Sequence, residues 1–164
     1  MAVSYFKCEY IPLMIEQLTK VCCESPKWHC RRSGIEFIQN FVFSNMFNVR
    51  PYAEQIHKII FKCLFDDQIE VRILSCETLS GLYQCGFIEV TREDFKYFQK
   101  MSKTKCSSQI SNELSQRHGG ILGLCAIVLS SPYDIQKYVP NALMILCEHS
   151  NQPNIVQVET FFCF

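Results

Sequence analysis

The sequence has no excess of either charge, since 16 basic and 16 acidic residues among its 164 give a formal net charge of zero. Without a net positive charge, no overall electrostatic field favours binding to nucleic acid or to an anionic membrane. Glycine and proline are scarce, with 6 of each, while hydrophobic residues make up 48% of the chain. This composition excludes a disordered chain and predicts one domain with a buried core.

Long hydrophobic runs are missing as well. The longest clearly apolar stretch, residues 121–129, is too short to cross a bilayer. Near the N-terminus, Lys7 and Glu9 interrupt what would be the apolar core of a signal peptide. We therefore expect a soluble protein with no membrane partner.

Catalytic signatures are absent from the sequence, which contains no GxSxG, P-loop or GxGxxG motif. None of the histidines pairs with cysteine or an acidic residue at zinc-ligand spacing; they are His29, His57, His118 and His149. A catalytic cysteine–histidine pair stays open, because such partners need only meet in space. We expect a binding protein rather than an enzyme, with no metal and no cofactor, and a cysteine hydrolase is the remote alternative.

The 11 cysteines are odd in number and never occur at CxxC spacing, which argues against a disulfide framework or a zinc site. Most lie on predicted helix faces beside aliphatic residues, where free cysteine behaves as a small core hydrophobe. Examples are Cys22, Cys63, Cys76, Cys125 and Cys147. We expect reduced thiols and therefore an intracellular protein.

The most regular segment covers residues 66–87 and predicts one amphipathic helix. Asp66 and Asp67 stand where an N-cap and the helix dipole favour acidic residues, and Gly86 can close the helix in a left-handed conformation. Steps of three and four place one stripe on a single face: Val71, Leu74, Ser75, Thr78, Leu79 and Leu82. An acidic start, Arg72 and such a stripe form the second-helix pattern of a HEAT repeat, in which the arginine reaches a neighbouring repeat's acidic turn.

Similar stripes recur on both sides of this helix. Thr91 and Asp94 form a capping-box-like start, and residues 100–112 are polar and predict a surface loop. Glycines 119, 120 and 123 inside a helical pattern suggest close packing against a neighbour. The remaining predicted helices cover residues 10–23, 28–43, 51–65, 114–130 and 141–149, with another starting at 151.

The arginines repeat at nearly constant spacing, with 41 residues from Arg31 to Arg72 and 45 from Arg72 to Arg117. HEAT and armadillo units have periods of roughly 40–47 residues. We therefore predict an all-α fold, an α-solenoid of HEAT/ARM-like helical hairpins, in which Trp28 and the three arginines join adjacent repeats; a generic helical bundle is the alternative. The predicted pairs cover about 10–47, 51–87, 91–130 and 133–164, the last incomplete.

Four segments carry a more specific resemblance: SPKWHCR at 25–31, DDQIEVR at 66–72, ETLSGLYQCGF at 77–87 and RHGGILGLCAIVLSSPYDIQKYVPNALMILCEHSNQP at 117–153. They resemble the C-terminal region of the proteasome activator complex subunit 4 family, large HEAT-repeat activators that cap the 20S proteasome. The likeness covers about residues 26–153. Because family members are far longer, we expect an isolated terminal piece or a truncated product.

The resemblance implies a solenoid that binds the α-ring of the 20S proteasome and opens its gate for unfolded or acetylated substrates without ATP or ubiquitin. It also implies a nuclear and cytoplasmic location and a part in DNA repair and spermatogenesis. Family members open the gate with a C-terminal tail whose penultimate residue is tyrosine, whereas the sequence here ends in Cys163 and Phe164. We expect a binding module without gate opening, and the alternative is a free-standing scaffold.

The family resemblance also implies recognition of acetylated lysine on histones by an Asn-Phe pair. The matching positions here are Gly86 and Phe87, so the asparagine amide is missing and only Phe87, with Tyr83 one turn earlier, supplies apolar contact. The alternative is that Gly86-Phe87 is an ordinary helix C-cap. Because family members bind inositol phosphates at basic openings, the arginines could line such a groove instead of joining repeats, namely Arg31, Arg32, Arg72 and Arg117.

Overall fold

The computed structural model describes residues 8–104, 111–131, 133 and 135–150, and every regular element in that part is helical. The helix expected from residue 151 lies outside the described residues. Within the described part, every helix falls short of the length or hydrophobicity that crossing a membrane requires. In chain order the elements are η1 (Cys8–Tyr10), α1 (Ile11–Glu24), α2 (Trp28–Ser44), α3 (Met46–Val49), η2 (Arg50–Tyr52), α4 (Ala53–Cys63), α5 (Ile69–Gln84), α6 (Arg92–Ser102), α7 (Ser111–Leu129) and α8 (Val139–Ser150).

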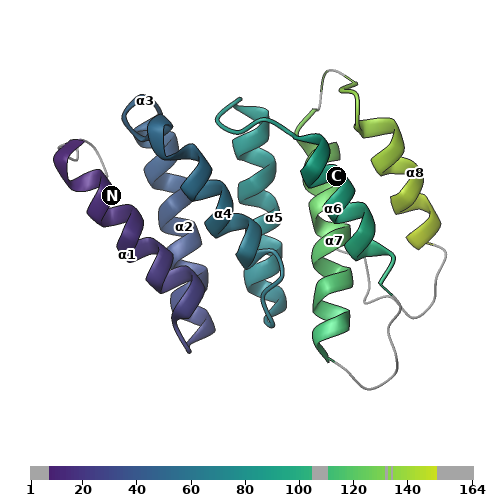
Figure 1. The fold of residues 1–164 in the computed structure, drawn as a ribbon, viewed down its shortest axis with the longest axis horizontal. Helices are drawn as coiled ribbons and strands as arrows, with labels where there is room; N and C mark the ends of the chain where they lie inside the picture. The colour runs from purple at the N-terminus through teal and green to yellow at the C-terminus, as the bar shows by residue number, and fades with distance from the viewer. Residues whose placement is uncertain (1–7, 105–110, 132, 134, 151–164) are drawn as a thin grey trace.

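The helix pairs lie side by side in a row, and the long helices of this row form two layers (Figure 1). Helices α1, α4, α6 and α8 form one layer, and α2, α5 and α7 form the other. Within pairs, α1 packs on α2, α4 on α5 and α6 on α7; between pairs, α2 packs on α5, α5 on α7 and α7 on α8. This is the all-α helical-repeat fold that the sequence predicts.

One hydrophobic core runs through the described pairs, from Ile11 in α1 to Ile145 in α8. The predicted stripe of α5 is buried at each of its six positions, which confirms the face of the central helix. In α1, steps of three and four predict a buried stripe of Ile11, Met14, Ile15, Leu18, Val21 and Cys22. This stripe is only partly buried, because Val21 is 39% exposed. Val21 instead lines an apolar groove of about 330 Å³ between α1 and α2, together with Leu13, Met14, Gln17, Leu18 and Phe37.

Helix α5 begins three residues later than predicted, at Ile69. Its N-cap residue is Gln68, which makes no side-chain capping bond. Asp66 instead turns the chain before the helix, because its Oδ1 accepts a hydrogen bond from the Gln68 N–H at 2.9 Å. The prediction that Asp66 and Asp67 cap α5 is therefore wrong, and both carboxylates are available to other helices.

The end of α5 follows the sequence prediction. Gly86 has a φ of +65° and lies in the left-handed region that closes a helix. Its N–H donates to the Tyr83 carbonyl at 3.1 Å, and the Phe87 N–H donates to the Leu82 carbonyl at 3.0 Å. These two bonds form a Schellman motif, whose usual hydrophobic contact is supplied here by the buried Phe87.

Helix α6 starts with the predicted capping box. The Thr91 hydroxyl accepts from the Asp94 N–H at 3.0 Å, and the Asp94 carboxylate accepts from the Thr91 N–H at 3.4 Å. The helix runs three residues into the segment expected to be a loop, ending at Ser102, and α7 begins within that segment, at Ser111. The loop prediction for residues 105–110 lies outside the described residues.

The cysteines whose side chains the structure describes are free thiols, as predicted. Four are buried in the core, namely Cys22, Cys63, Cys76 and Cys125. The fifth predicted core cysteine, Cys147, is exposed on α8, so its placement was wrong. Two of the buried thiols also connect adjacent pairs, because Cys63 donates to the Cys22 carbonyl at 3.5 Å and Cys76 to the Leu122 carbonyl at 3.2 Å.

The three glycines of α7 allow neighbouring chain segments to approach its backbone, as the sequence suggested. A Cβ at Gly119 would lie 2.5 Å from the Leu64 carbonyl oxygen, and one at Gly120 would lie 2.5 Å from the Ser102 nitrogen. A Cβ at Gly123 would overlap the buried ring of Phe98. Helix α7 therefore touches the end of α4 and the end of α6 without an intervening side chain.

We expect Gly120→Ala to destabilise the protein by about 1–3 kcal/mol, because the new methyl group meets backbone atoms that cannot rotate away. Chemical denaturation followed by circular dichroism measures the change. Gly81→Ala is the matched control: its Cβ would lie 3.2 Å from the tip of Phe43, which is 45% exposed and can move. The control should stabilise the helix by up to roughly 1 kcal/mol, the helix propensity gained over glycine. Equal midpoints for the two variants would contradict the packing of α7.

Candidate functional site

An arginine connects the first helix pair to the second. Arg31 of α2 forms a bidentate ion pair with Asp66, with Nε 2.6 Å from Oδ2 and Nη2 2.7 Å from Oδ1. Its Nη2 also lies 2.6 Å from Oδ1 of Asp67, and Nη1 donates to the Ser25 carbonyl at 2.9 Å. The hydrogen bond to Asp66 raises the pKa of Arg31 above its usual value. The guanidinium thus ties the end of α1 and the start of α2 to the turn before α5.

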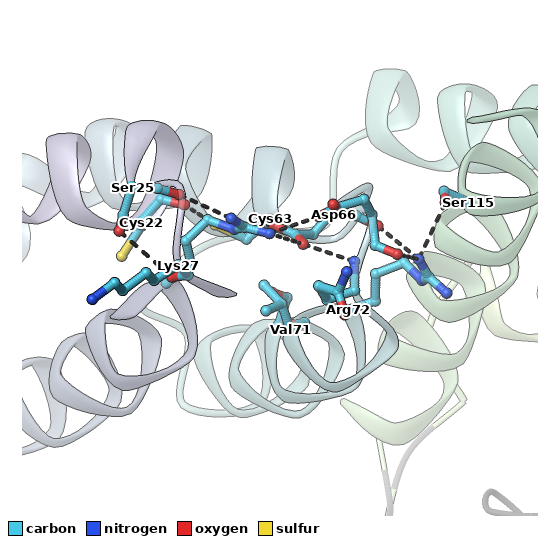
Figure 2. A network of polar contacts seen from close by, with 12 residues as sticks. Cys22, Ser25, Lys27, Cys63, Asp66, Val71, Arg72 and Ser115 are labelled. Atoms are coloured by element: carbon cyan, nitrogen blue, oxygen red, sulfur yellow. Dashed lines mark hydrogen bonds and ion pairs between the residues drawn. The ribbon is translucent and has the colours of Figure 1, made fainter. Parts of the chain in front are cut away.

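A second arginine continues this connection into the third pair. Arg72 of α5 is 6% exposed, and its Nη1 donates to the carbonyl oxygens of Asp66 at 2.7 Å and Asp67 at 3.1 Å. Toward α7, Nη1 lies 3.2 Å from the Ser115 hydroxyl, and Nε donates to Nδ1 of His118 at 2.9 Å. Figure 2 shows Asp66 between Ser25 on one side and Ser115 on the other. The turn at Asp66 and Asp67 therefore binds both Arg31 and Arg72.

The Arg72 joint requires a neutral histidine, because Nδ1 of His118 accepts the hydrogen bond. Burial, and then the charge of Arg72, lower the pKa of His118 to about 4. Burial also lowers the pKa of Arg72, against the Asp66 and Asp67 carboxylates, which raise it. At neutral pH the joint holds one positive charge, and carbonyl dipoles and nearby carboxylates stabilise it.

The last described joint involves Arg117 of α7. Its Nη2 lies 3.4 Å from Nδ1 of His149 in α8, so a histidine again stands where the sequence predicts an acidic turn. Burial, and then Arg117, lower the pKa of His149. Trp28, predicted with the arginines, is half-buried at the start of α2, where its ring centroid lies 3.6 Å from that of the adjacent His29.

The position that the family resemblance assigned to acetyl-lysine lies at the end of α5. Gly86 is exposed, and a Cβ placed there would meet open space. Phe87 and Tyr83 are 3% and 5% exposed, so both side chains belong to the core. The structure therefore brings the three residues together at one helix end, with only the glycine on the surface.

A buried polar cluster lies beside this helix end and joins the second pair to the third. Nε2 of His57 in α4 is 3.8 Å from Oδ2 of Asp94, the capping residue of α6. Burial lowers the pKa of His57 although the carboxylate opposes the shift, and burial with Asp94 raises the pKa of Tyr83. Among the described residues, the Tyr83 hydroxyl and Nε2 of His57 have no hydrogen-bond partner.

Among the described residues, histidine, cysteine, aspartate and glutamate never gather in a group of three that could hold a metal ion. A second groove, of about 260 Å³, lies between α1 and α4 and is lined by Thr19, Cys23, Glu24, Gln55, Lys58, Ile59 and Lys62. Burial raises the pKa of Cys125 to about 12, which leaves a core thiol protonated and a poor nucleophile.

The histidine acceptors were not predicted from the sequence. His118 was considered only as a metal ligand or a catalytic base, and its partner Arg72 lies 46 residues away. The repeat spacing is the one signal that points to these acceptors. Arg72 and Arg117 occupy equivalent positions, and each needs a hydrogen-bond acceptor in the next unit. The dual role of Asp66, which holds Arg31 by its carboxylate and Arg72 by its carbonyl, has no signature in the sequence.

Comparison with known proteins gives one consistent match. The family model described as "Proteasome activator complex subunit 4-like, C-terminal" matches residues 114–162. The chain is 35% identical over 163 residues to proteasome activator complex subunit 4 of Homo sapiens and 34% identical to that of Bos taurus, covering 90% of this chain and 9% of each relative. Proteasome activator subunit 4 of Arabidopsis thaliana is 28% identical over 142 residues, covering 82% of this chain and 8% of the relative.

We expect stability to fall between pH 6.5 and pH 4 because of His118. Its pKa is about 4 in the folded protein and about 6.5 in an unfolded chain, so the unfolded state binds the proton more tightly. This contribution is fully present above pH 6.5 and is lost as the pH falls toward 4, at a cost of roughly 2–3 kcal/mol. Thermal denaturation across this range provides the measurement.

His118→Gln serves as the test variant, because an amide oxygen can accept from Arg72 and does not titrate. Its stability should depend less on pH than that of the unmodified protein. His29→Gln, which replaces an exposed histidine outside this joint, is the matched control. A His118→Gln profile parallel to that of the unmodified protein would show that this joint does not titrate.

Proposed function

Because the chain belongs to the family of proteasome activator complex subunit 4, we propose that it is a helical-repeat binding module that docks on the α-ring of the 20S proteasome. One observation carries the proposal: the similarity to named proteasome activators extends over 90% of the chain. The chain spans 9% of the length of these relatives, so docking is proposed for the surface of this segment alone. Degradation without ATP or ubiquitin belongs to the same proposal.

The physical support comes from how the helix pairs are joined. Arg31 and Arg72 fix successive pairs through bonds to one turn, and α7 is fixed by backbone contacts at its glycines. A rigid row of helices presents an extended surface with little conformational entropy left to lose on binding. The same proposal includes a nuclear and cytoplasmic location, which imaging of a fluorescent fusion tests.

Binding to immobilised, purified 20S particles tests the function. We expect the recombinant 164-residue chain and the Gly81→Ala variant to bind, and the Gly120→Ala variant to bind less at temperatures where its fold is lost. A folded chain that fails to bind would favour the alternative, a stand-alone scaffold.

For the end of α5 we propose a more specific function, the binding of acetylated histones. Because Gly86 has no amide and the rings of Tyr83 and Phe87 are buried, we expect the unmodified chain to bind acetylated histone peptides weakly. A side-chain amide at this exposed position could donate a hydrogen bond to the acetyl carbonyl. Leaving that carbonyl unpaired costs about 1–3 kcal/mol, which corresponds to roughly tenfold in affinity or more.

We therefore expect Gly86→Asn to bind an acetylated histone peptide about tenfold more tightly in calorimetry. Asparagine tolerates the left-handed conformation of Gly86, and the space around a new Cβ is open. Gly86→Ala adds a Cβ without an amide and is the matched control, together with the unacetylated peptide. Equal affinities for the asparagine and alanine variants would refute acetyl-lysine recognition at this position.

A further inference from the structure

Three thiols meet where α1 lies beside α4. Cys22 and Cys23 are near the end of α1, and Cys63 is the last residue of α4, 41 positions after Cys22. The Cys63 thiol donates to the Cys22 carbonyl at 3.5 Å, and Cys23 is the next residue of α1. All three are free. Adjacent repeats therefore bring sulfur atoms together across a joint.

The three thiols differ in access to solvent. Cys22 and Cys63 are 1% and 2% exposed, and the Cys22 sulfur points toward α2, where it lies 2.6 Å from the position of a Cβ on Gly34. Cys23 is half-buried and lines the groove of about 260 Å³ between α1 and α4. A small reagent that enters this groove meets Cys23 and, on the α4 side, Lys62, the residue before Cys63.

We propose that sustained oxidation joins Cys23 and Cys63 in a disulfide between the first and second helix pairs. A hydroperoxide is the oxidant. Its terminal oxygen is transferred to the Cys23 sulfur, which gives a sulfenic acid while the hydroperoxide is reduced to water or an alcohol. The Cys63 sulfur then attacks the Cys23 sulfur, the S–O bond breaks and water leaves. Two thiols lose two electrons and two protons in total.

The surroundings make this reaction slow at neutral pH. The hydrogen bond with Cys63, and then burial, raise the pKa of Cys23, and Lys62 opposes the shift only in part. Hydrogen bonding to Cys22 and burial raise the pKa of Cys63. Because the thiolate is the nucleophile in both steps, the rate should increase with pH across the neutral and mildly alkaline range. The reduced protein is therefore the resting state, and the bridge needs a sustained oxidant.

The bridge has a defined mechanical result. It closes a loop that contains α2, α3, η2 and α4, and a cross-link of this kind restricts the unfolded chain. It also holds α1 against α4 beside the Arg31–Asp66 ion pair. Oxidation should thus raise the melting temperature and fix the angle between the first two pairs.

Peptide mapping after treatment with hydrogen peroxide tests the proposal on the full chain. Trypsin places Cys22 and Cys23 on residues 21–27 and Cys63 on residues 63–72. We expect these two peptides to be joined, with the loss of two hydrogen atoms, and fragmentation between the adjacent cysteines to locate the bond at Cys23. A thiol reductant should reverse both the link and the rise in melting temperature.

Variants separate this pair from the other thiols. Cys23→Ser should abolish the link, whereas Cys22→Ser and Cys30→Ser should retain it; Cys30 is an exposed cysteine of α2 and is the matched control. Circular dichroism confirms that each variant is folded. A link through Cys22, a link that persists in folded Cys23→Ser, or unlinked peptides after prolonged oxidation would each overturn the proposal.

Discussion

A guanidinium taken out of water must be surrounded by acceptors, and the arrangement of the described helices follows from how Arg72 meets that need. Its acceptors are two carbonyl oxygens of its own turn, a hydroxyl and a neutral imidazole from α7. Losing any of them would leave a buried charge under-solvated, which costs far more than an exposed contact gains. The turn before α5 and helix α7 are therefore fixed relative to one another, and Asp66 extends that constraint to Arg31 in the first pair.

The polar joints would not align without the close backbone approach at α7. Glycines 119, 120 and 123 let α7 sit against the ends of α4 and α6 at distances that no other residue permits, and this position sets the depth of His118. Helix propensity is lost at each glycine, and tight packing against Phe98 and Ser102 offsets that loss. Specific polar bonds and small residues thus act together, and both are features of this sequence rather than of helical repeats in general.

The sequence predicted those features that depend on a few neighbouring residues. The buried stripe around Leu79, the capping box at Thr91 and the left-handed Gly86 each involve one or two turns of chain. Exposure of Val21 and Cys147 was not predictable, because periodicity identifies a face without identifying what covers it. The start of α5 was misplaced for a related reason: its acidic residues turn the chain and bind an arginine 35 positions away, rather than capping the helix.

In the candidate site, too, only part of the arrangement could be predicted from the sequence. The spacing of the arginines and the acidic turn at Asp66, which binds Arg31, could be read from the sequence. The histidine partners of Arg72 and Arg117 could be found only in the structure, because a neutral histidine has no distinguishing pattern as an acceptor. The acetyl-lysine position could be aligned by resemblance, whereas the burial of Tyr83 and Phe87 depends on packing against several helices.

The order of contacts along the row has a consequence for how the protein would respond to a pulling force. Each helix pair rests on its immediate neighbours, with α2 on α5, α5 on α7 and α7 on α8. Tension applied between the two ends therefore passes through the joints one after another rather than through all of them at once. The weakest joint yields first and lengthens the chain by one unit while the others hold. Such a molecule extends in steps, one helix pair at a time, and the joint at Arg72 should be among the last to open.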